Sequence, residues 1–382
     1  MRSPIITPGR GAPLLAVLWA ACLALPAAAQ RPAFGPGIGI RFESFSFRTP
    51  DAVGMDRLSL LTVPLGTSVR LSRALELGVS AAWASARLVE PDGNELKFSG
   101  PTDTEVRVVV HLGQDLVTLT GIALLPTGSE SLNSEEADLA GAIAADVLPF
   151  AISNWGSGGG AGMSAAIVRP LGSFSAGLSV GYVLARDFEP LEDDAFNYRP
   201  GNQLQVRAAL DRTFGRSSKA SLVFTMYQFQ EDEIDGSNLF RAGDRYEALG
   251  SLAFALGGTG AGVIYGGYLR RDQGEADDSE FAIDPRVLQA QDLLFTGVGF
   301  ELRSGSVTFR PSADLRVLRR DDGIDQGYTA DVGGSVEFPL GRLSVAPRLH
   351  GRFGNVLLQE DVESRFTGVD LGIGLRWRGF DR

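Results

Sequence analysis

Hydrophobic and polar residues alternate with a period of two along most of the chain beyond residue 37. The segment 366–378 shows this best, because Val369, Leu371, Ile373, Leu375 and Trp377 alternate with polar residues or glycine. Successive side chains of a β-strand point to opposite faces, so the pattern predicts strands with one apolar face. The alternating segments are about ten to fourteen residues long, which suits tilted bilayer-crossing strands better than soluble strands.

Sixteen such segments follow one another, joined by connections that are alternately short and long. The predicted strands are 37–47, 57–71, 74–88, 103–112, 115–126, 160–170, 173–186, 201–214, 218–230, 243–256, 259–271, 290–303, 306–318, 327–340, 343–354 and 366–378. The long connections are 48–56, 89–102, 127–159, 187–200, 231–242, 272–289, 319–326 and 355–365. Short turns on one side and long loops on the other are typical of membrane barrels. We therefore predict an all-β, transmembrane antiparallel up-and-down β-barrel of about 16 strands (roughly 14–18).

Aromatic residues at the ends of the predicted strands fit this architecture, because transmembrane barrels carry aromatic girdles at both membrane interfaces. They are Phe45, Phe47, Phe174, Phe214, Phe229, Phe338 and Trp377. No stretch of about 18 apolar residues follows residue 29, so the sequence predicts no helical membrane span.

The third long connection, 127–159, contains a segment with helical rather than strand-like periodicity. Ser134 and the two glutamates that follow predict a helix start with Ser134 as N-cap. Leu139, Ile143 and Val147 then recur at every fourth position, over about fourteen residues, until Pro149. Three interpretations stay open. The helix caps the barrel mouth, it folds into the lumen and constricts the pore, or the segment is a further strand.

Residues 1–29 have the features of a signal peptide, and 30–382 would form the barrel domain. Two arginines precede the apolar run 13–25, and three alanines end at Ala29, where cleavage is expected. A lipoprotein, cleaved before Cys22, is the alternative. Cys22 is the only cysteine, so the mature barrel has no disulfide. Export together with a barrel predicts the outer membrane of a Gram-negative-type cell envelope.

Charge and histidine content limit the chemistry that this chain can perform. The net charge of −11 argues against a nucleic-acid partner. The two histidines, His111 and His350, lie in no motif of a barrel hydrolase, so we predict that the protein is not an enzyme and needs no cofactor or metal. The acidic stretches 192–194, 231–236 and 277–280 lack the spacing of calcium loops and are interpreted as solvated loop charge.

Arginines and acids share the polar faces of the predicted strands. Charge on a lipid-facing position costs roughly 2–4 kcal/mol for Arg or Lys at the bilayer midplane, so these side chains are expected to line the lumen. They are Arg107, Arg207, Arg310, Arg316, Arg348, Arg352 and Arg376, with Glu105, Asp314, Asp331, Glu337 and Asp370. Opposed charges of this kind would tune ion selectivity in an open lumen or hold a closed one together by salt bridges.

The last strand resembles the assembly signal of bacterial outer-membrane proteins, carried by Asp370, Gly372, Leu375 and Trp377. Members of that group usually end on Phe, whereas this chain continues through 378–382. The layout resembles porins and outer-membrane transporters, and Leu124-Leu125-Pro126-Thr127-Gly128 resembles a strand end of the phenol-degradation meta-pathway type.

This resemblance implies passive passage of small solutes, including hydrophobic ones. It also implies contact with outer-membrane lipid, lipopolysaccharide and the barrel-assembly machinery. The alternative function is a structural or surface-binding barrel with a closed lumen.

Overall fold

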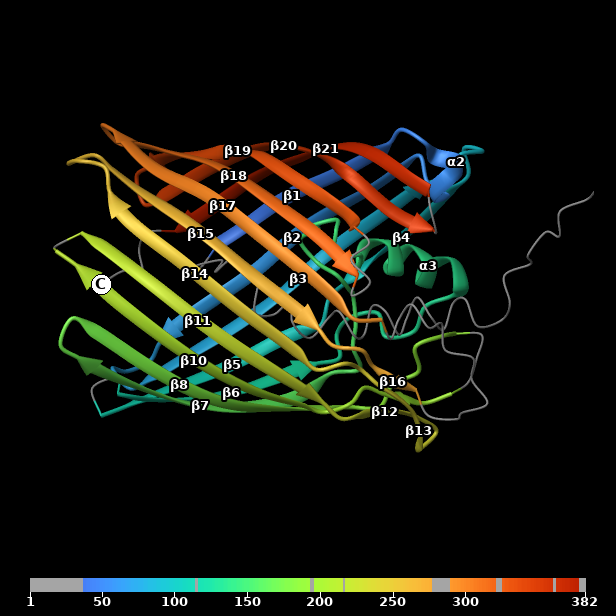
Figure 1. Cartoon of the computed structure of the whole chain (residues 1–382), viewed down its shortest axis with the longest axis horizontal. Helices are drawn as coiled ribbons and strands as arrows, with labels where there is room; N and C mark the ends of the chain where they lie inside the picture. Colours follow the sequence, from blue (N-terminus) through green and yellow to red (C-terminus); the bar gives the residue numbers. More distant parts are fainter. Residues whose placement is uncertain are drawn as a thin grey trace, which may run out of the picture.

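Sixteen strands of the described chain close into one antiparallel barrel (Figure 1). The computed structural model describes residues 37–113, 116–192, 196–215, 217–276, 289–320, 325–359 and 362–377. The predicted signal peptide and residues 378–382 lie outside these ranges. The barrel strands are β1 (Gly37–Phe47), β2 (Arg57–Arg70), β3 (Leu75–Val89), β5 (Thr104–Leu112), β6 (Val117–Leu125), β7 (Gly160–Leu171), β8 (Phe174–Ala185), β10 (Gln203–Phe214), β11 (Ser218–Phe229), β14 (Arg245–Ala255), β15 (Gly260–Arg271), β17 (Gln291–Ser304), β18 (Val307–Arg320), β19 (Asp325–Leu340), β20 (Leu343–Gln359) and β21 (Val362–Trp377).

The barrel closes between its first and last strands. β1 pairs antiparallel with β21 from Gly37 opposite Arg376 to Phe47 opposite Phe366. The predicted barrel and its strand number are therefore confirmed. The predicted connections 319–326 and 355–365 are shorter than expected, because β18, β19, β20 and β21 continue into them.

One barrel position is filled by two strands in sequence. The long-loop half of β3 pairs with β4 (Glu95–Pro101) and its other half with β5. The interruption falls at Thr102, whose hydroxyl accepts a hydrogen bond from the Ala82 amide at 2.9 Å. Alternation alone did not predict β4, because its short segment lies inside the predicted connection 89–102.

The outer face of the barrel is apolar. Its exposed large side chains include Ile40, Met163, Leu222, Leu349 and Ile373. Among the aromatic residues at strand ends, Phe174, Phe214, Phe338 and Trp377 alternate in step with this outer face. The prediction is wrong for Phe45, Phe47 and Phe229, which are buried on the inner face. These three residues occupy the inward-facing positions of their strands, the same alternate positions as the residues that face the lumen.

A second, four-stranded sheet is built entirely from long connections. It contains β9 (Tyr198–Arg199), β12 (Glu231–Ile234), β13 (Ser237–Arg241) and β16 (Glu275–Ala276). The acidic stretch 231–236 is therefore not an open solvated loop but a hairpin. Its turn is formed by Asp235 and Gly236, both with positive φ, as a two-residue hairpin turn requires. Residues 193–195 and 277–288 lie outside the described chain, and they include most of the acidic stretch 192–194 and all of 277–280.

Two helices occur in the described chain. α2 (Pro50–Val53) lies in the connection between β1 and β2, and α3 (Ser134–Ile143) lies in the connection between β6 and β7. Neither is long and apolar enough to cross a membrane.

Candidate pore interior and its loop

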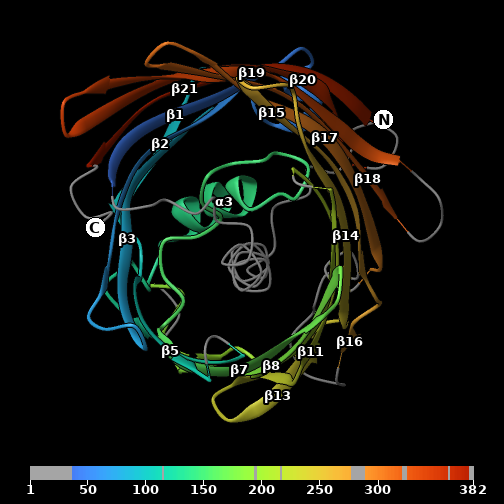
Figure 2. The same cartoon turned by 90° about the vertical axis from the view of Figure 1, so that its left-hand side faces the viewer.

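The connection between β6 and β7 folds into the barrel. Viewed along the axis, α3 lies inside the ring of strands, next to the wall that contains β1, β2 and β21 (Figure 2). Leu139, Ile143 and Val147 are almost completely buried there. The segment is therefore not a further barrel strand, and its buried side chains pack against the inner wall. We call residues 127–159 the lumen loop.

The helix begins and ends differently from the prediction. Asn133 is the N-cap, and its side chain accepts a hydrogen bond from the Glu136 amide at 3.0 Å. Glu136 in turn accepts from the Asn133 amide at 3.1 Å, which completes a capping box. The helix ends at Ile143, so Val147 lies in the irregular segment that follows and not in the helix.

The lumen loop packs on an apolar part of the inner wall. Its buried residues form one cluster with Phe45, Leu58, Leu60 and Ala86. The indole of Trp155 lies edge-on against Phe98 at 4.9 Å between ring centroids. Its Nε1 donates to the carbonyl oxygen of Ala84 at 3.2 Å. Burial of this kind stabilises a fixed position of the loop rather than a mobile one.

One carboxylate joins the two ends of the lumen loop. Asp103 accepts hydrogen bonds from the Gly128 amide at 3.1 Å and from the Ser157 amide and hydroxyl, both at 2.8 Å. A Cβ atom on Gly128 would lie 2.0 Å from the carbonyl oxygen of Trp155, so this position requires glycine. The segment 124–128, chosen for its resemblance to a transporter motif, therefore has a structural role at the base of the loop.

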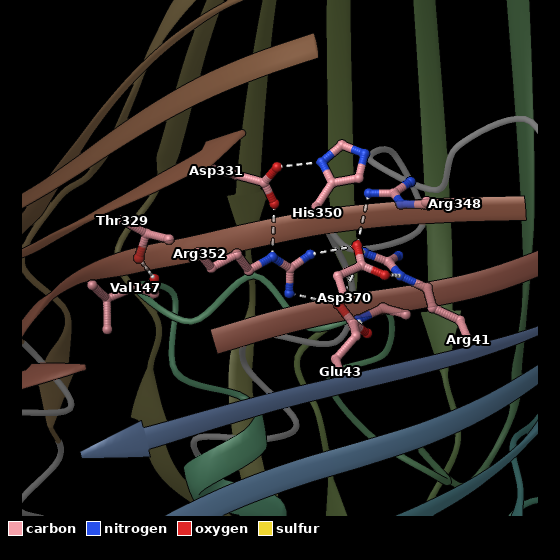
Figure 3. Close-up of polar contacts among 10 residues, drawn as sticks. Arg41, Glu43, Val147, Thr329, Asp331, Arg348, His350, Arg352 and Asp370 are labelled. Carbon is pink, nitrogen blue, oxygen red and sulfur yellow. Dashed lines mark hydrogen bonds and ion pairs between the residues drawn. The ribbon is translucent and has the colours of Figure 1, made fainter. Parts of the chain in front are cut away.

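A buried cluster of ionic side chains lies beside the loop, on β1, β19, β20 and β21 (Figure 3). Arg352 is at its centre. It donates to Glu43 at 2.8 Å, to Asp331 at 2.7 Å and to Asp370 at 2.9 Å. Glu43 and Asp370 are fully buried.

Two more arginines and a histidine complete this ionic cluster. Arg41 makes two contacts with Asp370, at 3.1 and 2.9 Å, and Arg348 contacts the same carboxylate at 2.8 Å. His350 hydrogen bonds to Asp331 through Nδ1. Three arginines thus face three carboxylates, which offsets the cost of burying each charge.

The ionic cluster and its strands hold the end of the lumen loop. Glu43 accepts a hydrogen bond from the Ala151 amide at 2.8 Å. The Thr329 hydroxyl donates to the carbonyl oxygen of Val147 (Figure 3). Asp314 and Arg316 lie on the same inner wall, and Arg316 interacts electrostatically with Asp146 of the loop. The loop is thus attached to the wall by polar contacts as well as by apolar packing.

The opposite wall, formed by β5, β10 and β11, differs because its inward-facing cations stay exposed, and we call it the open wall. Arg107 contacts Glu105 at 2.8 Å, and 45% of the arginine side chain is exposed against 7% of the glutamate. Lys219 contacts Asp211 at 2.9 Å and is half-exposed. Arg207 is exposed and shares the electrostatic field of Glu247.

The structure places the predicted lumen residues in four locations. Asp331, Arg348, Arg352 and Asp370 meet in the ionic cluster, while Asp314 and Arg316 lie next to it. Arg310 bridges Glu337 at 2.7 Å and Glu301 at 3.2 Å towards the short-turn end. Arg107, Glu105 and Arg207 line the open wall, and Arg376 is exposed at the end of β21.

Sequence reasoning missed Arg41, Glu43 and Asp103. Arg41 and Glu43 alternate with the exposed apolar Ile40 and Phe42, so the parity of the first strand was a usable signal for both. Asp103 lies at the interruption between β4 and β5, where alternation carries no information.

Within the terminal segment, Leu375 and Trp377 lie on the outer face, whereas Asp370 belongs to the ionic cluster. A Cβ atom on Gly372 would lie 3.2 Å from the Ile40 carbonyl oxygen of β1, which favours glycine at the closing pair.

Comparison with known proteins gives a general likeness only. No family model and no curated protein sequence matches the chain. Among solved structures, a bacterial polysaccharide outer membrane secretin is 8% identical with a TM-score of 0.44, covering 90% of this chain and 99% of its own. A mutant of the Rhodopseudomonas blastica porin is 13% identical with a TM-score of 0.36, covering 88% of this chain and 98% of its own. At these TM-scores the matches add nothing to what the barrel's own geometry shows.

Proposed function

We propose that this chain is an outer-membrane channel through which small polar solutes diffuse passively. The barrel has an apolar outer face, a lumen loop fixed to one wall and solvent-exposed charges on the opposite inner wall. The observation that carries the proposal is the set of solvent-exposed charges on the opposite inner wall. A lumen filled by side chains would bury the charges on both walls, as the ionic cluster is buried on one.

The charged open wall favours polar solutes over the hydrophobic ones that the resemblance of segment 124–128 implied. In the ion pairs of the open lumen the cation is more exposed than the acid. This holds for Arg107 with Glu105, Lys219 with Asp211, and Arg310 with Glu337. Because permeating ions meet the more exposed charge first, we propose a preference for anions.

The test is a pair of planar-bilayer measurements on the purified protein. We expect stepwise conductance and, under a KCl gradient, a reversal potential that indicates anion preference. The double variant Arg107→Gln/Arg207→Gln removes two exposed lumen cations and should shift the reversal potential towards cation preference. The matched control Arg169→Gln/Arg212→Gln removes two exposed cations from the outer face and should leave the reversal potential unchanged.

Absence of conductance from the wild-type protein would contradict the channel. It would favour the alternative, a structural or surface-binding barrel with a closed lumen. An unchanged reversal potential in the lumen variant would contradict the anion preference alone.

A further inference from the structure

Five cations stand on neighbouring strands at the long-loop end of the outer face. They are Arg48, Arg57, Arg87, Lys97 and Arg365, and we call them the basic sector. They belong to or directly follow β1, β2, β3, β4 and β21, which form one continuous part of the wall (Figure 2). All five side chains are exposed.

Alternation along the strands shows that Arg57, Arg87, Lys97 and Arg365 point away from the lumen, and Arg48 directly follows β1. Phe47, Leu58, Leu88, Phe98 and Phe366 are buried against the lumen loop, and each is adjacent in sequence to one of the five cations. The strand register brings the cations together. Ser46 pairs with Arg57, Ser59 pairs with Arg87, and Arg87 pairs with Lys97. The Arg48 amide donates to the Arg365 carbonyl oxygen at 2.8 Å.

The outer face changes character in one direction along this part of the wall. Phe42 and Trp83 are exposed apolar side chains that suit lipid tails. Outward-facing hydroxyl groups come next, with Ser44 opposite Ser59 and Ser85 opposite Ser99. The cations follow. This sequence of apolar groups, hydroxyl groups and cations parallels a leaflet from its acyl chains to its headgroups.

The charges in the basic sector are only partly neutralised. Glu95 contacts Arg87 and also Lys97, the latter at 2.6 Å. Arg48, Arg57 and Arg365 form no ion pair with any residue that the structure describes. Glu363, which is also on the outer face, instead accepts a hydrogen bond from Asn355 at 2.7 Å.

The far side of the barrel provides the contrast. There the outward-facing Arg270 donates to Asp272 at 2.9 Å and lies 3.7 Å from Asp292. Asp292 also accepts a hydrogen bond from the Tyr268 hydroxyl at 2.6 Å. A protein with a net charge of −11 thus balances outward charge on one side and leaves cations on the other.

We infer that the basic sector binds the phosphorylated headgroup of an outer-leaflet lipid, with the phosphates of lipid A as its ligand. Arginine is suited to this role because its guanidinium forms two-point contacts with phosphate oxygens. The inference rests on the proposed outer-membrane position, since long loops of such barrels face the outer leaflet. It does not require an open channel.

The experiment is native mass spectrometry of the folded protein in detergent, titrated with bisphosphorylated lipid A in the presence of EDTA. We expect Arg48→Gln/Arg57→Gln to weaken binding by about thirtyfold, the loss for two cations near an anionic surface. Arg48→Lys/Arg57→Lys, which keeps the charge, should retain most of the affinity. The control Arg169→Gln/Arg342→Gln removes two exposed cations at the short-turn end and should bind like wild type.

Equal binding by the two glutamine variants would overturn the inference, as would equally tight binding of dephosphorylated lipid A to the wild-type protein. Binding of lipid A to the wild-type protein only when EDTA is left out would also overturn it, because divalent cations bridging to carboxylates would then hold the lipid. Bilayer conductance of the same samples separates the two proposals. A non-conducting barrel that binds lipid A through these arginines would refute the channel and leave this site standing.

Discussion

The two walls of the barrel carry the same alternating pattern but have different inner faces. On the wall of β19, β20, β21 and β1, Glu43, Arg352 and Asp370 are buried beneath the lumen loop. On the wall of β5, β10 and β11, Arg107 and Lys219 remain exposed. The loop starts at β6 and ends at β7, beside the exposed wall, and crosses the lumen to the buried one (Figure 2). Whether the charges on an inner wall are buried therefore depends on the packing of the lumen loop. The residues of this loop are far in sequence from the strands that they cover.

The largest expected effect concerns a single arginine on each wall. Arg352→Met leaves Glu43, Asp331 and Asp370 without their common cation, so we expect a loss of about 3–5 kcal/mol in the free energy of unfolding. Arg107→Met removes a cation that is itself 45% exposed and should cost much less, about 1 kcal/mol. Urea titration of the folded barrel, followed by heat-modifiable gel migration, measures both. Similar losses for the two variants would contradict the distinction between the walls.

Asp232, in the loop sheet outside the membrane, is a buried carboxylate that can be compared with Asp370 of the ionic cluster. Asp370 has three arginine partners, whereas the partners of Asp232 among the described residues are the Tyr198 hydroxyl and the Gly201 amide. Burial raises the pKa of Asp232 to about 6, while these hydrogen bonds oppose the rise. The folded loop sheet therefore binds a proton more tightly than the unfolded chain.

The stability that this proton contributes is fully present below about pH 4 and is lost as pH rises through about 6. The expected change is roughly 3 kcal/mol in the local stability of the loop sheet. Amide hydrogen exchange of β12 and β13 between pH 4 and 7, corrected for intrinsic exchange rates, measures it. Asp232→Asn should abolish this pH dependence, and its persistence in the variant would assign it to another group.

The smallest expected effect tests one contact between the buried wall and the loop. Thr329→Val removes the hydroxyl that donates to the Val147 carbonyl oxygen and should cost about 1 kcal/mol. Amide exchange across 139–151 should become faster while the unfolding of the barrel changes little. Unchanged exchange in this segment would mean that apolar packing alone holds the loop.

The sequence predicted the strands and their faces because a half-buried strand imposes a period of two over many residues. The positions of Arg348, Arg352 and Leu371 follow from parity alone. Alternation predicts which side of the barrel a residue faces but not what covers it. The contacts of the ionic cluster and the position of α3 could therefore not be predicted from it. The loop sheet was missed although Asp235-Gly236, a strong hairpin signal, lies between its two longest strands. The surrounding acidic residues had suggested a solvated loop.

Single-channel conductance with and without the lumen loop tests the central claim most directly. Deleting Asn133 to Phe150 removes α3 and leaves every strand of the barrel intact. If a solute path runs along the open wall, the wild-type protein conducts, and the deletion variant conducts several-fold more because the space that α3 occupies is added. Equal conductance of the two proteins, or a folded deletion variant that does not conduct, would contradict the account of a channel narrowed by its own loop.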